Sequence, residues 1–270
     1  WAAGEDILVL SDGTANLATL TAGNQIGVEA AGGMTLGTGT TLGTGPNDRF
    51  LSLFVSTAPS FLINSGLTPA TIRLTASAGA VNFTTLDAAA NLVVNARDGI
   101  SGAAMTAGRD IDATASAGPL VLSGDASAVR NLNLYGTSVS LRDVFVTGPA
   151  GYATLNATGD ALSLRDITAP GFTLVSEGGG ITGRTLTSTA PIGSGLEIAD
   201  INALGGAFAF NGVSALGDVL IIGSAGGTIT WAKLIGARSL MQGLKIPGPY
   251  WCVLHPYQWT HLVTSALATG

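Results

Sequence analysis

The amino-acid sequence predicts an all-β protein, a right-handed parallel β-helix (a solenoid) followed by a short C-terminal α/β segment. Three observations lead to this prediction: many short runs of alternating apolar residues, an internal sequence repeat, and a low content of charge. Of the 270 residues, 46% are apolar and 10% are charged, against a usual charged share of about 25%. Disordered chains have the opposite balance, so we expect a folded chain with a sizeable core.

Short apolar runs, separated by Gly, Asn, Asp or Ser, recur throughout the segment 1–228. Most are apolar–x–apolar triplets, a period of two that places both large side chains on one face of a strand. Almost none extends to the spacing of a helix, and the density of Gly, Thr and Val also disfavours helix. We therefore expect short strands at residues 7–10, 17–20, 26–28, 34–36, 51–53, 71–74, 92–94, 120–122, 132–134, 162–164 and 196–198.

An internal repeat predicts how these strands are arranged. Residues 131–144 align without gaps onto residues 154–167, at an offset of 23, with seven of fourteen positions identical. Units of about 20 residues that cannot bury a core alone indicate a solenoid of stacked coils. If the offset is one coil, Asp143 stacks on Asp166, and Leu141 and Leu164 both point inward.

The stacking also explains the low charge. Equivalent positions of successive parallel coils lie about 4.8 Å apart, so columns of like charge would repel. An Arg-Asp element recurs at 97–98, 109–110, 142–143 and 165–166, with a weaker echo at Arg184-Thr185-Leu186. These pairs form either an outward ladder of alternating charge or solvated turns, and we favour solvated turns.

A β-sandwich or barrel is the competing architecture, because such folds also contain short, regularly spaced strands. Hairpin-type dipeptides do occur at Asp12-Gly13, Asp98-Gly99 and Asn211-Gly212. However, the segment 1–228 contains no lysine, and the sequence repeat is present. Both observations favour the parallel β-helix.

Charge divides the chain into two parts. Residues 1–228 contain eight Arg and seventeen acidic residues, a net charge of −9, whereas residues 229–270 contain three basic residues and no acid. We therefore predict a parallel β-helix repeat body at 1–228 and a helix–strand–helix tail at 229–270. The expected tail elements are a helix from Trp231 to Met241, a strand from Tyr250 to Leu254 and a helix from Tyr257 to Leu267.

The body resembles the filamentous-haemagglutinin-type exoproteins and autotransporter passengers of bacteria. Residues 108–115 (Gly-Arg-Asp-Ile-Asp-Ala-Thr-Ala) and the Leu-x-Leu-x-(Ala/Gly) coils around them carry this resemblance, which covers most of residues 1–228. The resemblance implies secretion or surface display, adhesion and a structural stalk.

The tail resembles a different family. Residues 237–259, and above all Pro249 to Trp259, are similar to a segment of phage major capsid proteins in which a helix, a Pro-rich link, an apolar strand and a His-Pro turn follow one another. This resemblance implies a shell-building role without catalytic residues. A fused or chimeric chain, or a tail that caps the open end of the solenoid, would also account for it.

No catalytic, cofactor-binding or metal-binding residue is predicted. Cys252, His255 and His261 lie close together, but structural zinc needs four ligands and the tail has no carboxylate to orient a thiol–imidazole pair. Two pairs of body acids, Asp110 with Asp112 and Asp143 with Asp166, are typical of β-helix lyases, but only arginines are available there as bases. The run Gly178-Gly179-Gly180 lacks the Lys of a phosphate-binding loop.

Composition excludes further classes. The acidic balance argues against nucleic-acid binding, and one cysteine excludes an internal disulfide framework. No signal peptide is visible and the first residue is Trp, so we expect a fragment or a processed product. The most apolar window, residues 203–227, is interrupted by Asn211, Asp218 and several glycines, which predicts strands and not a membrane span.

These inferences together predict a non-enzymatic, structural and adhesive β-solenoid fragment of a secreted or surface-displayed bacterial exoprotein, located outside the cell or on its surface. Expected partners are a host surface, extracellular matrix or glycan ligand, with an outer-membrane secretion partner and self-association also open, and no nucleic acid. The alternatives are a phage virion structural protein or fusion and, third, a carbohydrate-active β-helix enzyme.

Overall fold

The structure, a computed structural model, describes residues 1–4, 6–43, 70–190, 199–215 and 219–223. The chain divides into two compact units, Trp1–Ala225 and Gly226–Gly270, close to the predicted boundary at 228/229. The predicted tail elements, together with the strands expected at 51–53 and 196–198, lie outside the described residues. Within the described residues every regular element is a strand.

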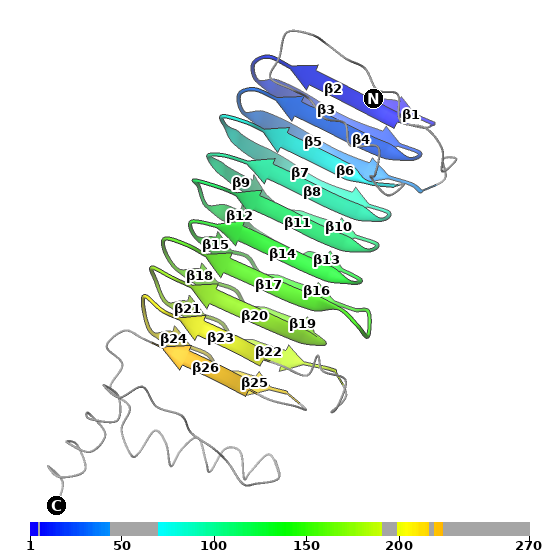
Figure 1. The fold of residues 1–270 in the computed structure, drawn as a ribbon. Coiled ribbons are helices and arrows are strands. Elements are labelled where there is room, and N and C mark those ends of the chain that lie inside the picture. Colours follow the sequence, from blue (N-terminus) through cyan, green and yellow to red (C-terminus); the bar gives the residue numbers. More distant parts are fainter. Residues whose placement is uncertain (5, 44–69, 191–198, 216–218, 224–270) are drawn as a thin grey trace, which may run out of the picture. The chain divides into compact units, whose positions relative to one another are not determined.

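The strands form two parallel sheets (Figure 1). In the described residues every strand pair is parallel, so the sandwich alternative is wrong. The ten-stranded sheet follows the chain order and contains β2 (Asp6–Ser11), β4 (Gln25–Ala30), β6 (Ile72–Ala76), β8 (Asn91–Ala96), β11 (Asp110–Ala115), β14 (Asn131–Gly136), β17 (Tyr152–Ala157), β20 (Gly171–Ser176), β23 (Ala199–Ala203) and β26 (Val219–Gly223).

The sixteen-stranded sheet starts as one row and then divides. Its first strands are β1 (Ala2–Ala3), β3 (Ala15–Ala22), β5 (Met34–Thr41) and β7 (Ala80–Ala88). Strand β7 pairs with both β9 (Gly99–Gly102) and β10 (Ala104–Ala107). One branch continues through β12 (Leu120–Leu122), β15 (Val139–Ser140), β18 (Leu162–Ser163), β21 (Ile181–Thr182) and β24 (Phe208–Ala209), and the other through β13 (Ala126–Ala128), β16 (Asp143–Val146), β19 (Asp166–Ala169), β22 (Thr185–Ser188) and β25 (Gly212–Ser214).

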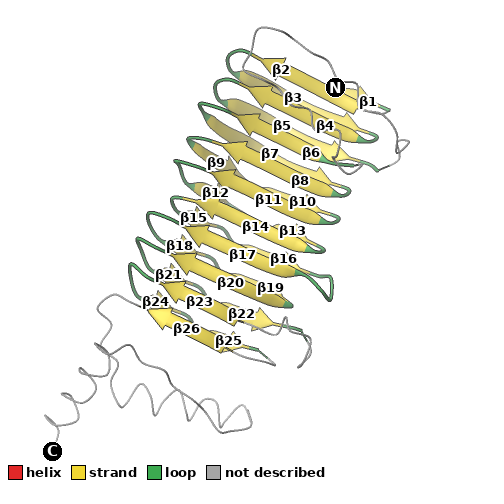
Figure 2. Cartoon of the chain, viewed as in Figure 1, coloured by secondary structure: helices red, strands yellow, loops and turns green. Residues whose placement is uncertain are grey.

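The chain is thus a parallel β-solenoid of about nine turns, as predicted. Figure 2 shows the strands stacked row upon row, joined by short loops. From β9 onward each coil consists of three strands, because the long strand of the early coils is replaced by two short strands with a bend between them. The right-handed sense of the winding stays a prediction. It is based on the rule that parallel crossovers are right-handed in about 98% of cases.

Coil length agrees with the predicted unit, but the gapless alignment at offset 23 is only half right. Asp143 pairs with Asp166, which is the predicted offset. In the ten-stranded sheet, by contrast, Leu134 pairs with Leu155, at an offset of 21. The cause is a turn of two residues between Gly136 and Val139 that becomes four residues in the next coil. The offset therefore changes from 21 to 23 within a single coil.

The core is a narrow interior filled by about one residue in two from most strands, whereas β24, β25 and residues 219–222 of β26, at the end of the described stack, contribute no buried residue. In β12, Leu120 and Leu122 are buried while Val121 between them is 39% exposed. Leu141 and Leu164 are also buried, so their predicted inward orientation is confirmed. Leu, Ile and Val of successive coils stack in columns that bring apolar surface together, which is the main stabilising contribution to such a fold.

Small residues occupy the ends of the strands, where each coil turns. In the ten-stranded sheet Ala30, Ala76, Ala96 and Ala115 follow one another in register, and all are buried. A larger side chain pointing into a corner would meet the adjoining strand of its own coil. The many Ala-ending runs of the sequence therefore mark the corners of the coil.

The apolar window of residues 203–227 contributes strands, as predicted for its described part: the end of β23, then β24, β25 and β26. In the stretches that the structure describes, no helix has the length and apolar character that a membrane crossing requires.

Candidate functional site

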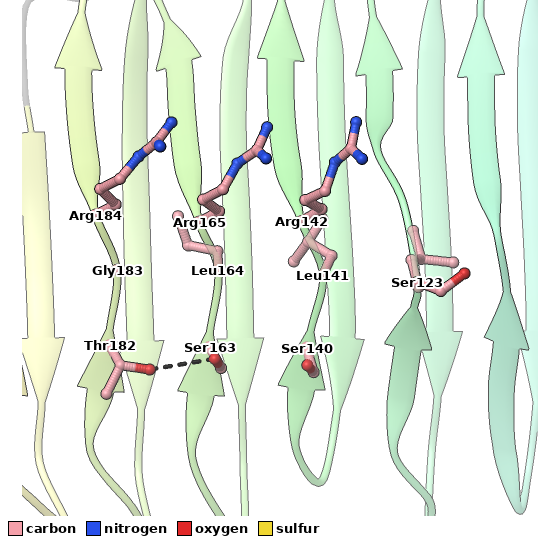
Figure 3. A pocket seen from close by; sticks show the side chains of 11 residues that line it. Ser123, Ser140, Leu141, Arg142, Ser163, Leu164, Arg165, Thr182, Gly183 and Arg184 are labelled. Atoms are coloured by element: carbon pink, nitrogen blue, oxygen red, sulfur yellow. Dashed lines mark hydrogen bonds between the residues drawn. The ribbon is translucent and has the colours of Figure 1, made fainter.

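A shallow groove of about 550 Å³ lies on the outside of four successive coils. It follows the bend between the two branches of the sixteen-stranded sheet. Figure 3 shows three arginine side chains side by side and pointing the same way, with a second row formed by Ser140, Ser163 and Thr182. The groove is lined by Leu122, Ser123, Ser140, Leu141, Arg142, Ser163, Leu164, Arg165, Thr182, Gly183 and Arg184.

The bend itself places these arginines outside. At two of the bends a buried residue, Leu141 or Leu164, is followed by an exposed Arg, because successive side chains point to opposite faces, and at the next bend Arg184 follows Gly183. The Arg165 backbone N–H donates to the carbonyl of Arg142, and the Arg184 N–H donates to the carbonyl of Arg165, both at 2.6 Å. The three arginines therefore occupy equivalent positions in neighbouring coils.

Carboxylates of the adjoining column bind each arginine. Nε and Nη2 of Arg142 donate to the two carboxylate oxygens of Asp125, at 3.0 and 3.3 Å. Arg165 binds Asp143 in the same two-point manner. Arg184 binds Asp166 likewise.

The contacts also continue within each coil. Arg142 Nε lies 3.8 Å from Asp143, and Arg165 Nε lies 3.4 Å from Asp166. The result is a continuous series of ion pairs, the "Arg–Asp ladder", made of Asp125, Arg142, Asp143, Arg165, Asp166 and Arg184.

The two kinds of charge lie at different depths. The side chains of Arg142, Arg165 and Arg184 are 52%, 42% and 55% exposed. The Asp143 and Asp166 side chains are 5% and 19% exposed, whereas that of Asp125, at the end of the ladder, is 34% exposed. The ladder balances its charges in number, but solvent meets mainly guanidinium.

The pairing changes the acid–base behaviour of the ladder. The hydrogen bond from Arg184 holds the pKa of Asp166 below its usual value, and the positive charges of Arg184 and Arg165 lower it further. The hydrogen bond to Asp143 raises the pKa of Arg165, and that to Asp166 raises the pKa of Arg184. Both effects favour the charged forms of Asp166, Arg165 and Arg184.

The Arg-Asp elements of the sequence do not share one column. Those at 142–143 and 165–166 belong to the ladder, and Arg184 continues it, with Thr185 in register with Asp166. Arg109 and Arg130 instead share Asp110 at another corner, where Arg130 donates to both carboxylate oxygens at 2.9 and 2.6 Å.

The favoured interpretation of these elements as solvated turns is right at one place and wrong at another. Arg97 and Asp98 are 62% and 53% exposed, with 3.8 Å between Nε and the carboxylate, and they do form a solvated turn. Asp143 is buried and bound by Arg165, so the ladder is the correct alternative there. The difference is that Asp143 of the Arg142–Asp143 element has an opposite charge, Arg165, in the next coil, whereas in the described residues Arg97 and Asp98 form an ion pair only with each other.

The hydroxyl rows beside the arginines were not identified from the sequence. Ser140, Ser163 and Thr182 are in register on one side of the arginines. Ser127, Phe145, Thr168 and Thr187 are in register on the other side. In the sequence these residues are ordinary Ser and Thr residues, one in most repeats. Only the strand register shows that they lie in rows.

The other candidate residues are placed as follows. Asp110 and Asp112 lie in the same strand, where burial raises the pKa of Asp112. Cys252, His255 and His261 lie outside the described residues. Among the residues that are described, no group of three or more His, Cys, Asp or Glu is arranged to hold a metal ion.

The run Gly178-Gly179-Gly180 lies in the turn between β20 and β21. A Cβ on Gly178 would lie 2.1 Å from the carbonyl oxygen of Gly159 in the preceding coil. Close stacking of turns, and not phosphate binding, therefore accounts for this glycine.

No protein-family model matches the chain, and neither curated proteins nor solved structures yield a match. The solenoid and its groove are thus the basis for any functional inference.

Proposed function

We propose that the chain is a structural and adhesive rod segment of a secreted or surface-displayed bacterial exoprotein. The observation that carries this proposal is the unbroken parallel register of the ten-stranded sheet from β2 to β26. Successive coils pair through strands of both sheets, and such stacking converts a repetitive chain into a stiff, extended element. The function of such an element is to provide length and surface.

The groove supports the adhesive half of the proposal. It is open and shallow, and it runs across four coils instead of closing around a small molecule. An extended ligand can contact several coils at once, and equivalent side chains then meet equivalent groups of the ligand. A host-surface or extracellular-matrix glycan has this character, whereas an enzyme of the carbohydrate-active type would need an acid and a base facing one bond.

Binding without turnover is the expected result of the test. The purified full chain is applied to an array of extracellular glycans and, in parallel, incubated in solution with each glycan that it binds. We expect retention on the array with no new reducing ends and no unsaturated sugar products. Appearance of such products would replace the adhesive proposal by the enzymatic one, and absence of any glycan or matrix binding would remove the adhesive half.

Surface display is tested separately. In cells that carry the gene, protease added from outside should remove the chain while cytoplasmic proteins stay intact. Protection of the chain until the cells are lysed would contradict the proposed location.

A further inference from the structure

The three guanidinium groups of the Arg–Asp ladder form a prearranged row. Each is fixed by two hydrogen bonds that use Nε and Nη2. Among the bonds within the described chain, the Nη1 group of each arginine takes no part, so it remains available to an external acceptor. Because the side chains are already held in place, a ligand would not have to order them, which lowers the entropic cost of binding.

The two columns next to this row contain no charged residue in the four described coils that the groove crosses. The columns on either side are made of Ser and Thr, with Val121 and Phe145 as apolar members. The carboxylates of Asp143 and Asp166 lie beneath the guanidinium groups and are already bound. An approaching anion therefore meets cations first and is flanked by hydroxyl groups.

The spacing selects the shape of the ligand. Neighbouring coils lie about 4.8 Å apart, and the row follows the stacking direction of the coils. A compact anion would contact one arginine, whereas a linear polymer with recurring acidic groups would contact all three.

The groups beside the arginines favour a polysaccharide over a nucleic acid. The hydroxyl columns can bond to sugar hydroxyls, whereas single-stranded nucleic acids are typically held by rows of aromatic residues, and Phe145 is the one aromatic residue in these columns.

We propose that the groove binds a linear acidic polysaccharide lying along the stack of coils. The carboxylate or sulfate groups of the polymer accept hydrogen bonds from Arg142, Arg165 and Arg184, and its hydroxyl groups bond to the flanking Ser and Thr. This inference rests on the proposed adhesive function and names the ligand class of the same site.

The test compares four polymers on the full chain by biolayer interferometry: polygalacturonate as the carboxylated polymer, dextran sulfate as the sulfated one, neutral dextran, and a single-stranded oligonucleotide. We expect binding of polygalacturonate, dextran sulfate or both. This binding should weaken as salt rises, because the contacts are exposed and screened. Neutral dextran should bind at least tenfold more weakly.

Two matched double variants locate the site. Arg165→Gln with Asp143→Asn removes one pair of the ladder without changing the net charge, and it leaves no unpaired buried carboxylate. Arg130→Gln with Asp110→Asn removes a pair of the same geometry at another corner. Loss of one charged contact should weaken binding by about tenfold in the ladder variant, and the corner variant should stay within twofold of the wild type. Circular dichroism melts establish that both variants fold.

Four outcomes would overturn the inference: equal binding of neutral dextran, tighter binding of the oligonucleotide, equal loss in the two double variants, or binding of neutral glycans on the array without either acidic polymer. In the last case the adhesive function would stand and only the ligand class would fall. If no glycan or matrix component binds at all, the adhesive half of the proposed function falls with it.

Discussion

At the scale of the residue, the ladder shows how a chain of low charge uses the few charges that it has. Asp143 and Asp166 are stacked on each other, an arrangement that alone would cost free energy through repulsion. The guanidinium of Arg165 contacts both carboxylates and replaces this repulsion by attraction. The arginine therefore makes the stacking of the aspartates possible.

The lowered pKa of Asp166 predicts an acid-sensitive contribution to stability. Its pKa is below the value of about 3.9 in the unfolded chain. The contribution is therefore complete above pH 3.9 and is lost as the pH falls through the lower, folded-state pKa. Asp166→Asn should melt at a lower temperature than the wild type at pH 7, and the two melting temperatures should converge below pH 4.

Asp112 provides a control of opposite sign, because burial raises its pKa. The charged form of Asp112 opposes folding at neutral pH, and this cost disappears as the pH falls through the raised pKa. Asp112→Asn should thus be at least as stable as the wild type at pH 7. Its melting temperature should therefore not start below that of the wild type and approach it as the pH falls. Parallel melting curves of all three proteins between pH 7 and pH 3 would contradict the assignment of the ladder.

At the scale of the element, the turns between strands are stacked as closely as the strands themselves. Gly178 lies over the backbone of Gly159, with no room for a Cβ. Gly13, in a turn of the second coil, has no heavy atom within 4 Å of the position that a Cβ would take. Two glycines of similar sequence context therefore have different structural demands.

Gly178→Ala should consequently lower the stability by about 1–3 kcal/mol, because the new methyl group forces two coils apart. Gly13→Ala should be neutral or slightly stabilising, since the unfolded chain loses conformational freedom without a clash. Denaturant unfolding of both variants measures the difference. Equal stability of the two would mean that the turns of neighbouring coils are not in contact.

At the scale of the whole body, the coils are interchangeable units. Residues 142–164 span one coil, since Asp143 is in register with Asp166. Their deletion joins Leu141 to Arg165, which then takes the place of Arg142 opposite Asp125. The strand β20 would at the same time take the place of β17 against β14.

We expect this deletion of one whole coil to fold, with an unchanged β-type circular dichroism spectrum, a cooperative transition and a body about 4.8 Å shorter. Deletion of residues 142–153 removes about half a coil and brings a strand of one sheet into the position of the other. That variant should aggregate or unfold. Similar stability of the two deletions would contradict the register on which the ladder depends.

Local alternation was enough to predict most of the fold. Leu120, Leu122, Leu132 and Leu134 belong to runs in which single outward residues separate the buried ones, and such a period of two is a property of the strand itself. The low charge and the repeat then predicted parallel stacking, because stacked columns tolerate small neutral residues best. The buried position of Leu141 and Leu164 followed from the same pattern.

The position of each coil relative to the next depended on the tertiary structure. A two-residue difference in one turn changes the offset from 21 to 23 within a single coil, and nothing in the alternating pattern indicates where such a difference is absorbed. The repeat predicted that Asp143 stacks on Asp166, and so that Arg142 stacks on Arg165, but only the structure shows that Arg184 continues this row while Arg97 and Arg109 lie outside it. Which side chains become neighbours is decided by the lengths of the turns, summed along the chain, and this sum is a property of the folded stack.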